Sequence, residues 1–330
     1  MSLQHVVYGL RLETNVALPG LPLASARNAV DVRIRVKDKW TCLPESFVST
    51  GEVLYISSQV SERGEPLLQV GMLEGGAYFG FFCADGTRFA VERAGREIWA
   101  DWAPDCTIED SATYLLGPIL AFVLWLKGLV SLHASAIVLD DRAIAFVGPG
   151  GAGKSTTAAA FAKHGFEVLS DDVVVLDVQG DDFLVRPAYP RVSLWPDSAQ
   201  VLFGPGDVLS RLAPSWDKRY LPLDGEHHKF ASRPIRLGAI YFLGTREKDL
   251  ASPVIEPFSG NRALLALFAE TYVNYLLTAD MQRRCFDVLG RIIDRVPVHN
   301  VQLASDPATA VDLCKVVTAH ARQLCSLQSP

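Results

Sequence analysis

Residues 148–156 read GPGGAGKST, and this stretch decides how the rest of the chain is interpreted. From Gly148 to Ser155 it satisfies the phosphate-loop pattern GxxxxGK[ST] in full. An apolar run precedes it at residues 143–147, and an Ala-rich run follows it at residues 157–163. These runs predict a strand, the loop and a helix in that order, which is the context that a phosphate-binding loop requires.

Each residue type in the loop has a physical task. Glycines permit positive φ angles and let main-chain N–H groups converge on an anion, and the positive end of the following helix adds to the attraction. We expect Lys154 to reach the β- and γ-phosphates of ATP and the Ser155 hydroxyl to coordinate Mg²⁺. The predicted nucleotide-binding residues are Gly148, Pro149, Gly150, Gly151, Ala152, Gly153, Lys154, Ser155 and Thr156.

A dinucleotide-binding site is the competing interpretation of the same stretch. Three glycines of the loop also satisfy GxGxxG, and Asp171-Asp172 lie roughly where such a fold places its ribose-binding acid. The segment Lys154 to Thr156 decides between the two, because a dinucleotide site has no use for it and a triphosphate–Mg²⁺ site needs it. The sequence therefore favours a phosphate loop.

The acidic pair Asp171-Asp172 is the next candidate for chemistry. It follows residues 166–170, which predict a strand beside the strand that carries the loop. Phosphoryl transfer needs groups that hold Mg²⁺ and often one that accepts a proton. Because neighbouring strand residues face opposite sides, one carboxylate can face the γ-phosphate while the other orients the metal. A turn pair that caps the next strand is the alternative.

Three further polar groups carry weaker signals. His133 begins the apolar run 133–139, where a histidine is typically a core residue. Glu226-His227-His228 does not favour a metal site, because adjacent histidines on a strand point in different directions. Lys218-Arg219 is either a phosphate contact or part of a solvated loop, and the sequence leaves that open.

The composition is that of a folded protein of one large domain or two. The 330 residues are 49% hydrophobic and 21% charged. The net charge of −6 does not favour nucleic acid or an anionic membrane as a partner. Six scattered cysteines without a CxxC pair fit reduced thiols in a cytoplasmic protein. Residues 1–9 lack the basic and apolar regions of a signal peptide, so secretion is not expected.

One apolar stretch is long enough to be tested as a membrane span. Residues 112–139 exceed the roughly 20 apolar residues that a transmembrane helix needs. Gly117-Pro118 breaks the first half, Lys127 lies inside the run, and Gly128 and His133 interrupt the second half. We therefore predict a buried helix followed by a buried strand, and no membrane partner.

The chain divides into two predicted domains. Residues 1–110 are rich in turn signals and strand-like runs, which predict a mostly antiparallel β-rich domain. It serves either as a structural cover or oligomerisation unit, or as a peptide-recognition platform. Residues 111–330 predict the catalytic domain. The expected strands are residues 31–36, 53–56, 78–82, 89–91, 133–139, 143–147, 166–170, 173–178 and 240–243, and the expected helices are residues 111–128, 157–163, 262–277, 281–294 and 307–324.

Three segments together resemble the catalytic core of the HPr serine kinase/phosphorylase family, whose core is shared with phosphoenolpyruvate carboxykinases. They are SLHASAIVL at residues 131–139, the loop itself, and VLSDD at residues 168–172. The resemblance covers residues 131–178 and implies an α/β fold whose phosphate loop follows a hairpin. It also implies catalytic roles for His133, Lys154, Asp171 and Asp172, with Asp171 as the proton acceptor and with Ser155 and Asp172 on Mg²⁺.

Beyond residue 178 the chain departs from that pattern. The family's downstream glutamate signature and the Arg-bearing segment of its phosphorylase activity are not found, and residues 187–195 and 218–223 stand there instead. These stretches, with YGL at residues 8–10 and LPGLP at residues 18–22, resemble a divergent branch that includes lasso-peptide precursor kinases. The implied partner is a peptide or protein with an acceptor serine, and the sequence leaves open whether the chain forms a homo-oligomer.

Three other functions stay open at this stage. The chain is otherwise a kinase of a small hydroxylated metabolite or free amino acid, or a nucleotide-binding regulatory module without catalysis. A carboxykinase-like lyase is disfavoured, because no set of substrate-binding arginines is recognisable in the sequence.

Overall fold

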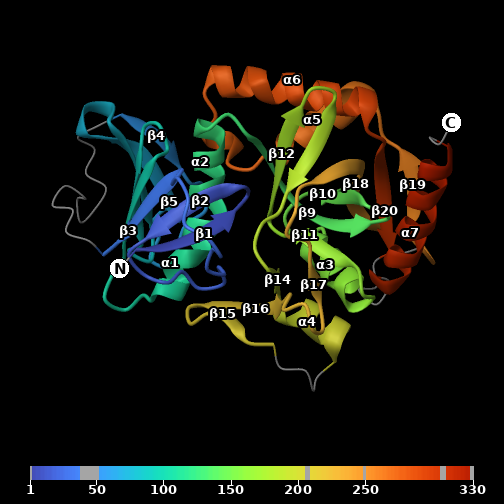
Figure 1. Cartoon of the computed structure of the whole chain (residues 1–330), viewed down its shortest axis with the longest axis horizontal. Coiled ribbons are helices and arrows are strands. Elements are labelled where there is room, and N and C mark those ends of the chain that lie inside the picture. Colours follow the sequence, from blue (N-terminus) through green and yellow to red (C-terminus); the bar gives the residue numbers. More distant parts are fainter. Residues whose placement is uncertain (1, 38–51, 205–208, 248–249, 305–309, 328–330) are drawn as a thin grey trace. The chain divides into compact units, whose positions relative to one another are not determined.

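The computed structural model describes residues 2–37, 52–204, 209–247, 250–304 and 310–327, and it has a mixed α/β fold with several sheets (Figure 1). The chain forms two compact units. Unit 1 comprises Met1–Leu129, Ala213–Trp216 and Tyr275–Thr278, and unit 2 comprises Val130–Leu212, Asp217–Asn274 and Ala279–Pro330. The first boundary thus falls at Leu129, later than the expected position at residue 110.

Unit 1 contains an eight-stranded sheet in the order β1-β2-β3-β8-β7-β6-β5-β4. The pairs β2–β3 and β3–β8 are parallel and the other neighbours are antiparallel, as a mostly antiparallel β-rich region requires. A short 3₁₀ turn, Glu74–Gly76, joins β5 to β6. The strands are β1 (Leu3–Val7), β2 (Leu10–Thr14), β3 (Val32–Val36), β4 (Val53–Ile56), β5 (Leu68–Leu73), β6 (Tyr78–Cys83), β7 (Arg88–Glu92) and β8 (Glu97–Asp101).

The apolar helix belongs to unit 1, which is why the boundary lies later than expected. It consists of α1 (Ile108–Tyr114), a π-helical turn (Leu115–Ile119) and α2 (Leu120–Leu126), and Gly117-Pro118 falls inside the turn. Phe122 of α2 packs against Phe79 and Phe81 of β6, with ring centroids 4.9 and 5.5 Å apart. By length and mean hydropathy (1.2), Ile108–Leu126 is able to cross a membrane, but 72% of the segment is buried in the structure, as in the core helix of a soluble protein.

Unit 2 is built on a nine-stranded sheet in the order β17-β11-β9-β12-β13-β18-β20-β19, with β10 paired to both β9 and β18. The expected hairpin is confirmed, since β9 and β10 pair antiparallel. Strand β10 pairs parallel with β18 on its other side. The strands are β9 (Val130–Leu139), β10 (Arg142–Val147), β11 (Glu167–Ser170), β12 (Val173–Gln179), β13 (Asp182–Arg186), β17 (Lys229–Phe230), β18 (Ile235–Glu247), β19 (Val254–Pro257) and β20 (Val298–Ala304).

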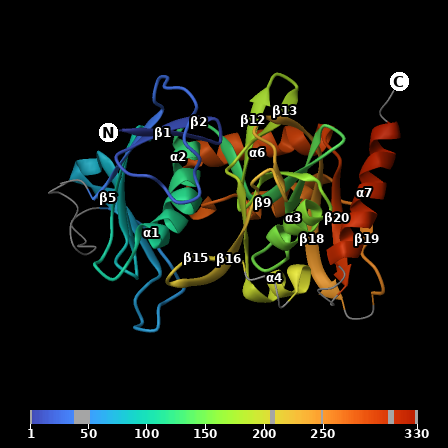
Figure 2. The same cartoon turned by 60° about the horizontal axis from the view of Figure 1, so that its bottom comes forward.

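Helices cover both faces of this sheet. Helices α3 (Lys154–Lys163), α4 (Pro196–Phe203) and α7 (Ala310–Leu327) pack into one core with β10 and β18, and Figure 2 shows α3 beside α4. At its centre, Phe146 lies 5.5 Å from Phe161 and 6.1 Å from Tyr241 between ring centroids. Helices α5 (Gly260–Ala269) and α6 (Ala279–Arg295) lie on the other side of the sheet in Figure 1.

Two predictions about the second half of the chain need correction. The expected helix over residues 262–277 ends at Ala269, and the chain beyond it turns, with Val273 at a φ of 51°. A single turn, Asn274–Leu276, follows. Within residues 187–224, a Pro-rich stretch for which no helix or strand was expected, lie β14 (Arg191–Leu194), α4, β15 (Arg211–Ala213) and β16 (Trp216–Pro222), and the three strands form a sheet in the order β14-β16-β15. Part of the expected helix 307–324 lies outside the described residues, and α7 begins at Ala310.

Candidate functional site

The loop between β10 and α3 has the backbone conformation that its glycines permit. The φ angles of Gly148, Gly151 and Gly153 are 152°, 80° and 100°. At Gly148 a Cβ atom would lie 2.6 Å from the carbonyl oxygen of Leu243, so no other residue fits without moving backbone. The strand, loop and helix therefore follow one another as the sequence indicates.

A cavity of about 310 Å³ opens beside this loop. It brings together His133, Asp172 and most of the predicted loop residues, whereas Gly148, Pro149, Ala152 and Asp171 do not line it. Five parts of the chain contribute its walls, namely β9, the loop with the start of α3, the bend after β11, the β14–α4 segment and β16. The lining residues are His133, Gly150, Gly151, Gly153, Lys154, Ser155, Thr156, Asp172, Ser193, Leu194, Trp195, Ser198 and Lys218.

Lys154 is buried at the start of α3 and holds the loop in place. Its Nζ donates to the carbonyl oxygens of Gly148 and Pro149 at 2.6 and 3.0 Å. Burial lowers the pKa of Lys154, while the nearby carboxylates of Glu270 and Asp172 oppose that shift. An ammonium group has three protons to donate, so one remains for an anion in the cavity.

The two adjacent aspartates do not lie on a strand, which corrects the expectation of opposite strand faces. They form a bend between β11 and β12, and β9 separates β11 from the loop strand β10. The Val173 N–H donates to the Asp171 carbonyl at 2.9 Å and closes a tight turn around Asp172, whose φ is 70°. Strained backbone of this kind is concentrated at functional sites.

Asp171 is buried and fully engaged by the surrounding protein. Its Oδ1 accepts a hydrogen bond from Ser135 Oγ at 2.7 Å, and its Oδ2 accepts one from the Ser193 N–H at 2.8 Å. A further hydrogen bond connects it to the Ser155 side chain. Burial raises the pKa of Asp171, and the hydrogen bonds from Ser193 and Ser135 oppose that shift. Asp171 thus helps to position the Ser155 side chain and does not itself line the cavity.

Asp172 presents its carboxylate to the cavity. Its Oδ2 accepts a hydrogen bond from the Tyr272 hydroxyl at 2.8 Å, and its Oδ1 lies 3.5 Å from His133 Nε2. About a third of its side chain (34%) is exposed, in contrast to the buried Asp171. Two neighbours therefore orient this carboxylate and leave it accessible from the cavity.

His133 is held on β9 by the segment that follows α5. Its N–H donates to the Glu270 carbonyl at 2.8 Å, and its ring packs edge-on against Tyr272 at 5.4 Å between centroids. Burial lowers the pKa of His133; Asp172 opposes this and Lys154 adds to it. The imidazole is consequently mostly neutral at pH 7.

Several residues of the site were not recognised in the sequence. Glu270 and Tyr272 reach the site from a segment about 100 positions downstream of Asp172 and belong to no motif. Burial raises the pKa of Glu270, and Lys154 opposes that shift. At the cavity rim Trp195 is 55% exposed, and Lys218 Nζ lies 5.2 Å from the centroid of its ring. Of the pair that the sequence left open, Lys218 lines the cavity and Arg219 does not.

The histidine-rich segment after β16 forms only an exposed cluster. Ligand atoms of Asp224, Glu226 and His227 lie within 4.8 Å of one another. The Asp224 carboxylate accepts N–H groups of Glu226 and His227 at 3.0 Å, which lowers the pKa of Asp224 to about 2. Those contacts are what a polar turn provides without a metal.

The donor set at the loop fits a magnesium-bound nucleotide. A Cβ atom added at Gly150 or Gly151 would meet no atom within 4 Å, so the main chain there faces open space. The Ser155 hydroxyl and the carboxylates behind and beside it are oxygen ligands, which Mg²⁺ prefers. Loop N–H groups and Lys154 supply the positive charge that phosphate oxygens require.

Comparisons with known proteins find matches among solved structures. No protein-family model matches the chain, and no curated protein matches it. Among solved structures, the chain is similar to the HPr(Ser) kinase/phosphatase from Coxiella burnetii, with 12% sequence identity and a TM-score of 0.33. The match covers 59% of this chain and 97% of that chain. At this identity and TM-score we take no residue role, activity or substrate from that protein.

Proposed function

We propose that the protein is a kinase that transfers the γ-phosphoryl group of ATP–Mg²⁺ to a serine hydroxyl of a peptide or protein. The observation that carries the proposal is that one cavity contains both the phosphate loop and an oriented, accessible carboxylate, Asp172. A binding module needs only the loop, whereas phosphoryl transfer also needs a group that accepts the proton of the attacking hydroxyl.

In this proposal the loop residues bind and polarise the phosphates. The N–H groups of residues 150–155 and the Lys154 ammonium stabilise the charge that develops on the transferred group. Ser155 holds Mg²⁺, with Asp171 hydrogen-bonded to its side chain. A magnesium ion held by Ser155 would supply positive charge that offsets the charge of the phosphate groups.

Asp172 is the proposed proton acceptor. It lines the cavity, and His133 and Tyr272 fix its two oxygens. The resemblance described above implies this role for Asp171 instead. The geometry favours Asp172 over Asp171 as the proton acceptor, because the oxygens of Asp171 already accept hydrogen bonds from Ser135 and Ser193 behind the cavity wall. His133 acts through Asp172 and is a positioning residue.

The cavity rim supports a peptide acceptor. Trp195 presents more than half of its surface there, beside the ammonium of Lys218. An exposed tryptophan offers a large apolar contact to a chain that brings its serine towards Asp172. A precursor of a lasso peptide is one acceptor of this class, and its serine would receive the phosphoryl group.

Mass spectrometry after incubation with ATP–Mg²⁺ tests the proposal. The panel contains serine peptides, the same peptides with alanine in place of serine, and free serine. We expect a gain of one phosphoryl group on serine peptides alone. Modification of free serine alone would favour a small-molecule kinase. Modification of no acceptor, with saturable ATP binding intact, would favour a regulatory nucleotide-binding module.

A further inference from the structure

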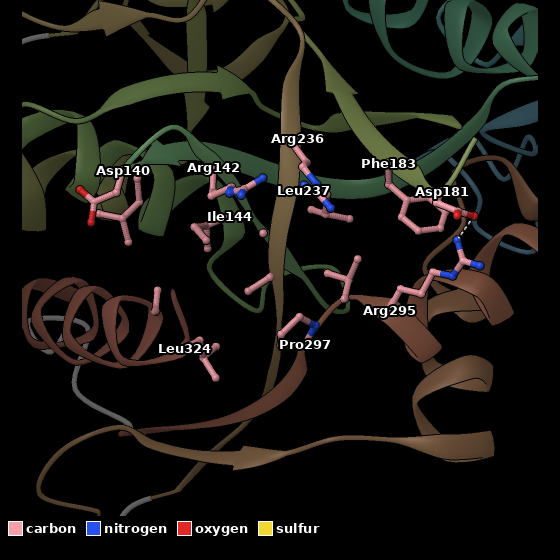
Figure 3. Close-up of a pocket in the computed structure, with 15 residues that line it drawn as sticks. Asp140, Arg142, Ile144, Asp181, Phe183, Arg236, Leu237, Arg295, Pro297 and Leu324 are labelled. Atoms are coloured by element: carbon pink, nitrogen blue, oxygen red, sulfur yellow. Dashed lines mark hydrogen bonds and ion pairs between the residues drawn. The ribbon is translucent and has the colours of Figure 1, made fainter. Parts of the chain in front are cut away.

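A second cavity of about 420 Å³ lies at the opposite end of β10 from the phosphate loop. Figure 3 shows the residues that line it. Arg142 is the first residue of β10 and lines this cavity, whereas Val147, the last residue, leads into the loop. The parallel neighbour β18 begins at Ile235, close to the same end of the sheet. The volume lies within the range of small-molecule sites, which is about 300–1,000 Å³.

The lining of this cavity combines apolar side chains with charged groups. Strands β9, β10, β13 and β18 supply side chains, as do helix α7 and the segment after α6. Most of these side chains are less than a tenth exposed. The apolar lining consists of Leu139, Ile144, Phe183, Leu237, Ala239, Val296, Pro297, Ala321 and Leu324.

The polar groups of the lining leave one positive charge without compensation. Arg236 pairs with Asp182 at 2.8 Å, and Arg295 pairs with Asp181. Asp140, at the tip of the hairpin, pairs with Arg322 at 2.9 Å. Among the residues that the structure describes, no hydrogen bond or ion pair engages the Arg142 side chain.

The pairing of β10 with β18 fixes the position of Arg142 in the cavity. Gly238 of β18 lies against it, and a Cβ at Gly238 would approach Arg142 Cβ to 2.7 Å. Figure 3 shows the Arg142 side chain directed from β10 towards Arg236 of β18. Because Arg142 is partly buried, an anion that pairs with its guanidinium is attracted more strongly there than at an open surface.

We propose that this cavity binds a small organic monoanion, in which one carboxylate is attached to an apolar body. The guanidinium of Arg142 donates two hydrogen bonds to the carboxylate in the bidentate geometry that arginine favours, and the apolar body lies against the apolar side chains of the lining. A single net charge on the ligand matches the single uncompensated arginine. The proposal does not depend on kinase activity, because neither the loop nor Asp172 contributes to this cavity.

Isothermal titration with octanoate tests the proposal on the full chain. Octanamide has the same apolar body without the charge, and inorganic phosphate has charge without the body. We expect octanoate to bind in the millimolar range or tighter, and both other compounds to bind at least tenfold more weakly, a difference of about 1.4 kcal/mol. Equal binding of octanamide, or equal binding of phosphate, would overturn the proposal.

Two variants test where octanoate binds, and a third variant is the matched control. Arg142→Met removes the charge and keeps the length, and we expect about tenfold weaker octanoate binding. Leu324→Glu places a negative charge at the partly exposed edge of the same cavity and should abolish binding. Arg284→Met changes an exposed arginine of α6 outside the cavity and should bind octanoate as the unmodified chain does. Unchanged affinity in Leu324→Glu would refute the site even if Arg142→Met failed to fold.

Discussion

The stability of unit 2 should depend on the protonation of His299. This histidine lies on β20, is 7% exposed, and stacks on Tyr241 at 5.6 Å between ring centroids. The ring of His320 meets it edge-on at 4.5 Å. Its buried Nδ1 has no hydrogen-bond partner among the described residues. Burial, reinforced by His320, lowers the pKa of His299 from 6.5 to about 4.

The sign and size of the effect follow from that shift. Because the folded-state pKa is lowered, the unfolded chain binds more protons than the folded chain between pH 6.5 and pH 4. Lowering the pH through this window therefore destabilises the fold. A shift of 2.5 units corresponds to about 3 kcal/mol once the pH is below 4, of which about 2 kcal/mol is lost at pH 5.

Urea unfolding at pH 7 and pH 5 measures this loss directly. His299→Phe keeps an aromatic ring against Tyr241 but cannot titrate, so its loss between the two pH values should be about 2 kcal/mol smaller than that of the unmodified chain. His164→Gln changes an exposed histidine and serves as the control, with the pH dependence of the unmodified chain. An equal loss in His299→Phe and the unmodified chain would refute the lowered pKa of His299.

Three further substitutions test the candidate site. Asp172→Asn should fold, since asparagine tolerates a φ of 70°, keep its affinity for ATP and lose about 10²- to 10⁴-fold in phosphoryl transfer; full activity in steady-state assays would remove Asp172 from the proton-accepting role. Lys154→Ala should weaken ATP binding by at least about tenfold in titration calorimetry, and unchanged binding would contradict the loop assignment. Gly148→Ala should destabilise the fold by about 1–3 kcal/mol in thermal unfolding, because its Cβ would meet the Leu243 carbonyl at 2.6 Å. Gly150→Ala, whose Cβ meets nothing within 4 Å, is the matched control and should unfold at nearly the temperature of the unmodified chain.

The local parts of the fold were predictable from the sequence. The hairpin of β9 and β10, the loop and α3 occupy adjacent residues, and each has a clear hydrophobic or glycine pattern. The apolar stretch after residue 110 was also correctly divided into a helix and a strand. That the helix belongs to unit 1 was not predictable, because its place depends on the packing of Phe122 against β6.

The candidate site was predictable only in part, because half of it comes from contacts between distant segments. Tyr272 and Glu270 follow α5, and no residue type or spacing marks them in the sequence. A bridge between Leu132 and Thr271 brings this segment against β9 and so places both residues beside His133. Short strands such as β14 were missed because the prolines around them suggested loops.

The different environments of Asp171 and Asp172 are visible only in the structure, and they are the basis for proposing different roles for the two residues. In the sequence Asp171 and Asp172 are equivalent neighbours, and the tight turn at Asp172 gives them different environments. Asp171 receives hydrogen bonds from Ser135, Ser193 and Ser155, so accepting a substrate proton would require it to give up contacts that hold the cavity wall. Asp172 accepts one hydrogen bond, from the Tyr272 hydroxyl, and faces a mostly neutral imidazole, which leaves acceptor capacity towards the cavity. Acid and base roles follow from such differences in environment. A carboxylate that is buried behind Ser155 is suited to support the metal-binding hydroxyl, and one that opens to the cavity is suited to accept the proton.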